Sequence, residues 1–430
     1  MVRYLKQAEP QSRQSNRELV ARVRAMLDEI EQYRDDAVKR YAAQLDRWTK
    51  PTFRVSDEEI GAVRRTMSPV FKEDFAFCKK QVTDFAKRQR ESLHEFEESF
   101  GAGITLGQKI IPVETVGCYI PGGKYPLISA AIMSVATAKV AGVPHVIGAA
   151  PPRDGEAMYA PTLYALAESG ADEIYTIGGV QAFASMAYGC VGMKAVDMIT
   201  GPGNAYVAEA KRQLFGRVGI DLPAGPTEIL ILADESADPS LAATDLLGQA
   251  EHGPDSPAWL ITTSEKFGRE VLNEIERQLL TLPTADVAGA AWRRWGEVVV
   301  VDDDDAAIAL SDEYAPEHLE VQTRRDGYYL SHLRNYGSLF LGEESTVAYG
   351  DKGVGTNHTL PTGRAARYTG GLWVGKFLKT VTYQRLTQEA SERIAPIIGR
   401  MCRTEGMLAH EITADVRAQR YAQRVRANSG

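Results

Sequence analysis

Four of the seven histidines in this 430-residue chain, His252, His318, His358 and His410, stand beside groups that bind metals or move protons. His252 follows Gln249 by three residues in GQAEHGPDS. On the last turn of a helix, that spacing puts both side chains on one face, as a two-point metal site requires. A histidine at a helix C-terminus is also favoured by the helix dipole. From this segment alone, both interpretations stay open.

Glu317 and His318 form an adjacent acid and base in YAPEHLE, directly after a helix-breaking proline. Neighbouring residues point in different directions, so the pair could serve two separate proton transfers. The alternative is a capping glutamate beside a solvated histidine, which the local sequence favours. Asp351 lies in AYGDKGVGTNH, a glycine-rich loop that can bring a carboxylate to a metal. His410 follows Glu405 by five residues in EGMLAH, and this spacing by itself indicates nothing more.

Three glycine-rich turns follow stretches that are predicted as strands: YIPGGK (119–124), TIGGVQ (176–181) and TGPGNAY (200–206). Bare backbone N–H groups and helix N-termini at such turns can bind phosphate-bearing cofactors. None of the turns matches the GxGxxG fingerprint, so turn geometry alone remains an alternative for each. Cys118 could be a thiol nucleophile for aldehyde oxidation. A small buried core residue is the interpretation that its sequence context favours.

The elements that must position these residues alternate between strand and helix over most of the chain. Helical periodicity covers about 16–45 and 56–96, strands and helices alternate from 112 to about 322, and the chain after Gly370 is predicted helical to its end. This pattern predicts an α/β fold with two Rossmann-like, doubly wound parallel-sheet domains and a small helical C-terminal segment. The predicted boundaries are an N-terminal arm over 1–20, a discontinuous first domain over 21–117 and 230–370, a second domain over 118–229, and a helical segment over 371–430.

The composition excludes several classes of protein. Hydrophobic residues make up 44% and charged residues 25% of the chain, as in ordinary globular proteins. The net charge of −8 disfavours a nucleic-acid binder. The chain contains four cysteines and no CxxC pair, which disfavours a disulfide framework and a thiolate zinc site. The first 20 residues lack the apolar core of a signal peptide, and no run approaches the roughly 20 apolar residues of a membrane span, so a cytoplasmic location is expected.

Eight segments occur in one order along the chain: GCYIPGG, AKVAGVP, GPGNAYVAEAK, DLPAGPTEILILAD, GQAEHGPDS, APEHLE, GTNHTLPTGRAARYTGGL and EGMLAH. Together they resemble the histidinol dehydrogenase family, from about residue 20 to 415. The resemblance implies a zinc-dependent, NAD-linked dehydrogenase that oxidises a primary alcohol through an aldehyde to a carboxylate. It also implies a homodimer in which the C-terminal segments are intertwined and the active sites are shared.

The same resemblance, carried over motif by motif, assigns the site residues. The implied zinc ligands are Gln249, His252, Asp351 and His410, a mixed oxygen and nitrogen set that suits zinc. Glu317 and His318 become the proton-transfer pair, and NAD is expected against Tyr119, Gln181 and Asn204 of the 118–229 domain. The implied substrate contacts are Thr227, Gln249, His252, His318, Asp351, Glu405 and His410, of which the partner subunit contributes the last two.

Departures from the usual family pattern bear on the substrate. Thr227 in PTEIL stands where the family has a serine, Leu127-Ile128 replaces a small hydroxylated pair, and ARYTGGLWV carries Trp373. These changes are similar to the branch that acts as sulfopropanediol 3-dehydrogenase, which oxidises 2,3-dihydroxypropane-1-sulfonate to 3-sulfolactate. A sulfonate needs cationic contacts, for which the candidates are Arg364, Arg367, Lys376 and Lys379, although each could equally be a surface charge.

Three alternatives remain beside this prediction. One is histidinol dehydrogenase itself, which converts histidinol to histidine. Another is a zinc hydrolase that uses the same ligands, with Glu317 activating water. The third is a metal-binding relative without activity, which the presence of both Glu317 and His318 disfavours.

Overall fold

The structure is a computed structural model that describes residues 2–9, 16–122, 125–223 and 225–428. It divides into two compact units, one formed by Met1–Arg90 and Val113–Phe377 and the other by Glu91–Pro112 and Leu378–Gly430. The glycine turn at 119–124 is described only in part, because Gly123 and Lys124 lie outside the described residues. No helix within the described residues combines the length and the apolar character that a membrane crossing requires.

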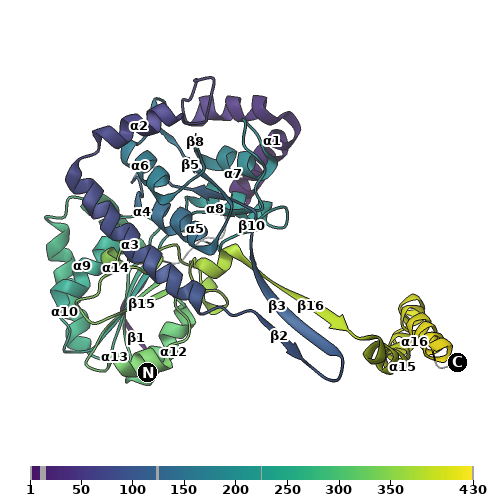
Figure 1. Cartoon of the computed structure of the whole chain (residues 1–430). Helices are drawn as coiled ribbons and strands as arrows, with labels where there is room; N and C mark the ends of the chain where they lie inside the picture. The colour runs from purple at the N-terminus through teal and green to yellow at the C-terminus, as the bar shows by residue number, and fades with distance from the viewer. Residues whose placement is uncertain (1, 10–15, 123–124, 224, 429–430) are drawn as a thin grey trace. The chain divides into compact units, whose positions relative to one another are not determined.

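The first unit contains a sheet, here sheet I, with the strand order β1-β13-β12-β11-β14-β15. Figure 1 labels its two edge strands, β1 and β15. Its strands are β1 (Arg3–Lys6), β11 (Ile229–Ala233), β12 (Ala258–Thr262), β13 (Glu297–Val300), β14 (His318–Gln322) and β15 (Ser338–Leu341). All neighbours are parallel except β1, which runs antiparallel to β13 at the edge. Part of the predicted N-terminal arm therefore forms an edge strand.

A second parallel sheet of the same unit, here sheet II, has the order β10-β9-β4-β5-β8. Its strands are β4 (Thr115–Tyr119), β5 (His145–Ala150), β8 (Glu173–Thr176), β9 (Met198–Thr200) and β10 (Gly219–Ile220). In both sheets the chain builds outward from a central strand and then reverses direction, between β4 and β9 in sheet II and between β11 and β14 in sheet I. This order is that of doubly wound nucleotide-binding sheets. The predicted α/β class with parallel sheets is confirmed.

Helices connect and cover the strands, and their ends follow local sequence rules. Asp238 caps the helix α9 and Pro239 opens it, because proline has no N–H to leave unpaired in the first turn. Asn204 caps α8 by accepting from the backbone N–H groups of Tyr206 and Val207. The helices of this unit are α1 (Asn16–Leu45), α2 (Asp57–Thr66), α3 (Pro69–Glu91), α4 (Ser129–Ala131), α5 (Thr137–Ala141), α6 (Ala160–Ser169), α7 (Gly179–Tyr188), α8 (Ala205–Leu214), α9 (Pro239–Ala250), α10 (Glu265–Leu279), α11 (Ala285–Trp295), α12 (Asp304–Tyr314), α13 (Asp326–His332) and α14 (Val347–Lys352).

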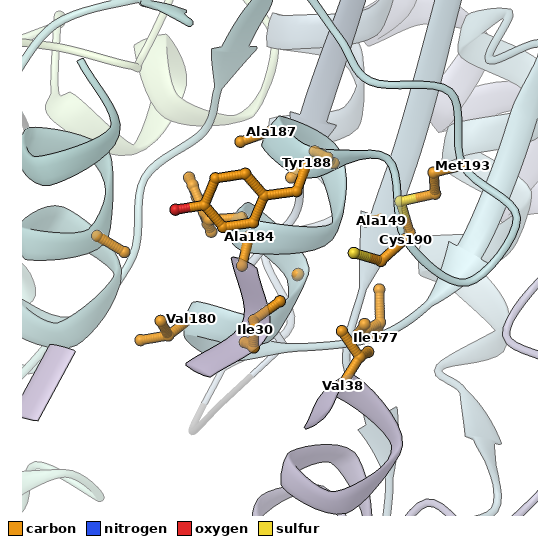
Figure 2. Close-up of a cluster of buried hydrophobic side chains, with 14 of the residues drawn as sticks. Ile30, Val38, Ala149, Ile177, Val180, Ala184, Ala187, Tyr188, Cys190 and Met193 are labelled. Carbon is orange, nitrogen blue, oxygen red and sulfur yellow. The ribbon is translucent and has the colours of Figure 1, made fainter. Parts of the chain in front are cut away.

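The long helix α1 packs on sheet II. Figure 2 shows Ile30 and Val38 of α1 among Val180 and Ala184 of α7, in one buried cluster that also includes Ile177. The apolar stripe of α1 is fully removed from water by this contact. The packing differs from the predicted grouping of 21–117 with 230–370, because the pattern of one helix does not specify which sheet will cover it. The domain boundaries themselves stay a prediction.

The second unit contains an antiparallel sheet and a helical hairpin. The sheet order is β16-β3-β2, and β16 pairs with β3 along its whole length. The bounds are β2 (Phe96–Ser99), β3 (Ile104–Pro112), β16 (Leu378–Leu386), α15 (Gln388–Thr404) and α16 (Leu408–Asn428). The predicted all-helical segment 371–430 is therefore wrong over β16. Its sequence, LKTVTYQRL, is rich in the β-branched and aromatic residues that favour strands, and β3 supplies a partner far away in the chain.

Candidate active site

A cavity of about 970 Å³ lies in the first unit, between the carboxyl ends of the strands of sheet II and the amino ends of those of sheet I. Its volume suits a small-molecule or cofactor site. The predicted site residues that line it are Tyr119, Gln181, Asn204, Thr227, His252, Glu317, His318 and Asp351. The fold thus places residues as far apart in the chain as Tyr119 and Asp351, which are separated by 232 positions, in the wall of one cavity.

Glu317 and His318 enter the cavity at the start of β14. Ala315 ends α12 in the left-handed conformation (φ 48°) and Pro316 stops the helix, so the chain turns directly into the strand. The Glu317 Oε2 atom accepts hydrogen bonds from Thr227 Oγ1 at 2.6 Å and from the Glu228 backbone N at 2.9 Å. Both members of the pair are buried. The alternative of a capping glutamate beside a solvated histidine is therefore wrong.

The ring of His318 is held by the strand beside it. Its Nδ1 lies 2.9 Å from the carbonyl oxygen of Glu228, and because a carbonyl only accepts, Nδ1 carries the proton. This leaves Nε2 buried without a hydrogen-bond partner among the described residues, 3.6 Å from Asp351 Oδ1. Burial lowers the pKa of His318, but the carboxylates of Glu317 and Asp351 outweigh burial and hold it well above its usual value. The surroundings therefore favour the charged form of this ring, in which both nitrogens carry a proton.

Glu228 is a second buried carboxyl beside this pair, and the sequence analysis did not identify it. Its Oε1 accepts from the backbone N of Gly363 at 2.8 Å, whereas its Oε2 has no partner within the described part of the chain. Burial, reinforced by the charge of Glu317, raises the pKa of Glu228 to about 7. This carboxyl is therefore largely protonated below neutral pH.

Gln249, His252 and Asp351 belong to the same neighbourhood. Gln249 stands in the last turn of α9, and its Nε2 donates to Thr227 Oγ1 and lies 3.4 Å from His318 Nδ1. His252 follows the end of the helix, and burial lowers its pKa although the charge of Asp351 opposes that effect. Burial raises the pKa of Asp351, but His318, His358 and Lys352 hold it below its usual range. The site thus offers an amide, a neutral imidazole and an ionised carboxylate.

These donors fit part of a zinc site. A neutral imidazole and a carboxylate are the protonation states that bind zinc, and an amide oxygen can complete a mixed set. Among the described residues no group of three or more His, Cys, Asp and Glu side chains is arranged to hold a metal. Of the predicted ligands of those types, the described part of the first unit holds His252 and Asp351, with the amide of Gln249 in the same neighbourhood.

The cofactor candidates meet at the carboxyl edge of sheet II. Tyr119 ends β4, packs on Phe183 with ring centroids 4.9 Å apart, and accepts from the Gly179 backbone N at 3.2 Å. Burial raises the pKa of Tyr119 to about 12, so its hydroxyl stays neutral. The Gln181 Nε2 donates to Asp46 at 2.8 Å, and its buried Oε1 has no partner within the described residues. Gln181 lines the cavity, and this oxygen is a buried acceptor that the described residues leave unpaired.

The 200–206 turn approaches Tyr119 so closely that only glycine fits at one position. Gly201 has φ +132°, and a Cβ there would lie 2.2 Å from the Tyr119 carbonyl oxygen. The turn is anchored by Asp221, which accepts from the Gly201 N at 2.9 Å and forms a buried ion pair with Lys211. These contacts place Asn204 at the cavity.

The remaining predicted residues lie elsewhere. Glu405, at the end of α15, and His410, in α16, are exposed residues of the second unit. Arg364, Arg367 and Lys376 do not line the described cavity, and Lys379 lies in β16 of the second unit. Arg367 Nε donates to the carbonyl of Arg364, and Lys376 donates to Thr369 Oγ1 at 2.8 Å. Cys118 is fully buried and burial raises its pKa to about 12, which confirms a core residue.

Several further residues line the cavity without having been predicted, among them Asp46, His358 and Lys352. Asp46, at the end of α1, binds Gln181 and the Gly178 backbone N. His358, singled out in the sequence but given no role, directs Nδ1 to the Asp351 carbonyl oxygen at 2.8 Å. Lys352 follows Asp351 directly, and a cation beside a candidate metal ligand was a signal available in the sequence. Nothing in the sequence around Asp46 pointed to its position.

Known proteins resemble this chain in both sequence and fold. A family profile described as histidinol dehydrogenase matches residues 9–418. A histidinol dehydrogenase homolog of Shouchella clausii is 53% identical over 98% of this chain and 100% of its own, and the sulfopropanediol 3-dehydrogenase of Ruegeria pomeroyi is 47% identical over 98% and 97%. The crystal structure of histidinol dehydrogenase from Elizabethkingia anophelis superposes with a TM-score of 0.88 at 33% identity, covering 96% of this chain and 94% of that one.

Proposed function

Because this chain belongs to the histidinol dehydrogenase family, a family of dehydrogenases, we propose that it is a zinc-dependent, NAD-linked enzyme that oxidises a primary alcohol to a carboxylate. The proposed substrate is 2,3-dihydroxypropane-1-sulfonate and the proposed product is 3-sulfolactate. The observation that carries the proposal is the single cavity in which the buried Glu317–His318 pair meets Tyr119, Gln181 and Asn204. The substrate is suggested by the relative named sulfopropanediol 3-dehydrogenase and by the departures at Thr227 and Leu127.

In this proposal His318 accepts the proton of the alcohol. Its Nδ1 is committed to the Glu228 carbonyl, so Nε2 of the neutral ring is the atom that takes that proton. The carboxylates that raise the pKa of His318 then stabilise the charged ring that results. Thr227, whose hydroxyl donates to Glu317, and Gln249, which donates to Thr227, hold the pair in place. Two hydrogen bonds to Glu317 Oε2 fix the position of the carboxyl group that would remove a proton from water.

Glu317 therefore acts in the second stage, when a water molecule attacks the aldehyde. One alcohol then yields one carboxylate, with a hydride leaving in each stage, so two NAD molecules are reduced per turnover. When bound, zinc would polarise the oxygen of the substrate, and NAD would accept each hydride. Gln249, His252 and Asp351 would hold the metal, and Tyr119, Gln181 and Asn204 would hold the cofactor.

The fourth zinc ligand, His410, and the substrate contact Glu405 would come from the partner subunit of a homodimer. Support comes from an apolar face on α15 and α16 whose side chains are 43% or more exposed. They are Ile397, Ile398, Met401, Met407, Leu408, Ile412 and Val416. An exposed apolar surface of this kind is typical of a subunit interface. In this proposal, the interface brings His410 to the zinc ligands Gln249, His252 and Asp351 and so completes the metal site.

Subunit exchange tests the shared site. An inactive His410→Ala chain is mixed with an inactive His318→Ala chain under conditions that exchange subunits. If the ligand crosses the interface, one site of each mixed dimer collects both defects and the other collects neither. With equal amounts and independent sites, about a quarter of the wild-type activity returns. If each site uses its own chain, no activity returns at any mixing ratio, which overturns the proposal.

The substrate is tested by a side-by-side assay with dihydroxypropanesulfonate and histidinol, following NADH. We expect the sulfonate to have the higher kcat/KM and to yield two NADH per alcohol. Since several similar relatives are named histidinol dehydrogenase or its homolog, a preference for histidinol would identify that activity instead. A zinc hydrolase would reduce no NAD with either alcohol.

A further inference from the structure

The substrate end of the cavity is rich in negative charge. Glu317 and Asp351 face it, and the buried carboxyl of Glu228 lies directly behind. His318 and the proposed zinc offset part of this charge, but both are assigned to the reacting hydroxyl of the substrate. An anionic group at the other end of the substrate would still be repelled by the carboxylates unless it meets a cation of its own. The residue that provides this cation would decide whether the enzyme accepts an anion.

Lysine and arginine occur twice among the described residues that line the cavity, as Arg22 and Lys352. Arg22, on α1, lies with its guanidinium 5.7 Å from the ring centroid of Tyr206, next to Asn204, on the proposed cofactor side. Lys352 ends α14 and lies at the opposite side, where its Nζ is 3.9 Å from Asp351 Oδ2. Its charge also lowers the pKa values of His252 and His358, two imidazoles on which the charge of Asp351 acts as well. Lys352 is therefore the lining cation at the substrate end.

The ammonium group of Lys352 is free to bind a ligand. Its side chain is 58% exposed, and its nearest acidic partner, at 3.9 Å, is beyond hydrogen-bond distance. By contrast, Lys376 is bound to Thr369, and Arg367 to its own loop.

We infer that Lys352 is the specificity-determining residue of this site, pairing with the anionic group of the substrate that Glu317 and His318 oxidise. The inference deepens the proposed function and rests on it for the reaction. It replaces Arg364, Arg367, Lys376 and Lys379 as the predicted sulfonate contacts. A sulfonate has three acceptor oxygens and an ammonium has three donors, so the pair forms charge-assisted hydrogen bonds.

The first test compares Lys352→Met with Lys352→Arg, which keeps the charge. The measured quantity is the ratio of the KM for dihydroxypropanesulfonate to the KM for the neutral propane-1,2-diol. Loss of one charge-assisted hydrogen bond should raise this ratio in Lys352→Met by roughly 10- to 100-fold, and Lys352→Arg should restore most of it. The matched control is Lys266→Met, because Lys266 is an 84% exposed lysine of α10 paired only with Glu270 among the described residues. An unchanged ratio in Lys352→Met overturns the inference.

A second measurement separates failure of this inference from failure of the proposed function. Propane-1-sulfonate, which cannot be oxidised at a hydroxyl, is titrated as a competitive inhibitor against whichever alcohol the enzyme oxidises. The proposed function fails if the wild-type enzyme oxidises histidinol but not dihydroxypropanesulfonate. The inference about Lys352 is then decided by inhibition alone: tighter inhibition of wild type than of Lys352→Met supports it, and equal or absent inhibition overturns it. Zinc content and thermal unfolding of each variant verify that Lys352→Met still folds and binds metal.

Discussion

The two parallel sheets of the first unit share one strand order but direct opposite edges at the cavity. Sheet II contributes its carboxyl edge, through Tyr119 after β4 and Asn204 after β9, as the rule for open α/β sheets predicts. Sheet I contributes its amino edge, through Thr227 before β11 and His318 at the start of β14. Two sheets of the same topology thus present different edges to the cavity, and they differ in the side chains that lie at their carboxyl edges.

Carboxylates occupy the carboxyl edge of sheet I. Asp238 caps α9 and Asp303 caps α12 there, and Asp234 accepts from the backbone of Ser236. These groups already satisfy the helix N-termini and would repel a phosphate. In sheet II, the corresponding helices α7 and α8 begin after Gly178 and Asn204, which carry no charge. Charge at the helix N-termini, rather than strand order, therefore distinguishes the carboxyl edge of sheet II, where we propose that the cofactor binds, from that of sheet I.

The largest expected effect tests the amino edge of sheet I as the place of proton transfer. His318→Ala should lower kcat for alcohol oxidation by about 10²- to 10⁴-fold, because a positioned base contributes that much. Glu317→Gln should damage the oxidation of the aldehyde more than that of the alcohol. Both stages are measured separately with alcohol and aldehyde as substrates. Equal losses in both stages for both variants would contradict the division of roles.

The next effect concerns metal binding at the same edge. His252→Ala should lose zinc and activity together, because the remaining ligands hold zinc poorly. Metal content is measured after gel filtration, with His332→Ala as the control. His332 is exposed and its Nδ1 is bonded within α13, to Ser331 and Tyr328. Full zinc content in His252→Ala would remove His252 from the ligand set.

A smaller effect is expected at the carboxyl edge of sheet II. Gln181→Ala removes the buried, unpartnered Oε1, and we expect the KM for NAD to rise by roughly 10-fold with a small change in kcat. Gln213→Ala is the control, since Gln213 also has an unpartnered Oε1 among the described residues but does not line the cavity. A loss confined to kcat would move Gln181 from cofactor binding to the chemical step and would weaken the contrast between the two edges.

The smallest effect concerns stability and pH. The pKa of Glu228 rises from an ordinary 4.5 to about 7 on folding, so the native state holds a proton that the unfolded state releases. Protonated Glu228 therefore adds to the free energy of unfolding below pH 4.5, and this contribution is lost as the pH rises through 7. Over pH 5 to 8 the loss amounts to ~2 kcal/mol. Glu228→Gln stays neutral and should escape it.

Thermal midpoints of wild type and Glu228→Gln, measured at pH 5 and at pH 8, provide the test. We expect the variant to gain about 2 °C on the wild type between the two pH values, because the unfolding entropy of a chain of this length gives roughly 1 °C per kcal/mol. A difference that does not change with pH would show that Glu228 is ionised in the native state.

The sequence by itself determined the α/β alternation, the family and the types of the site residues. Periodicity located the two ends of α1, and the glycine turns located Tyr119 and Asn204, because these signals are local. The motif order identified the family, which the comparison confirmed.

Tertiary structure alone decided which surfaces meet. It placed α1 on sheet II, paired β16 with β3 across more than 260 residues, and turned opposite edges of two like sheets toward one cavity. It also put Asp46, Glu228 and Lys352 beside residues far from them in the chain. Periodicity reports that a face is apolar and a residue is charged, but not which partner covers that face or which charge approaches it. That choice depends on long-range packing and on the loss of solvent around each group.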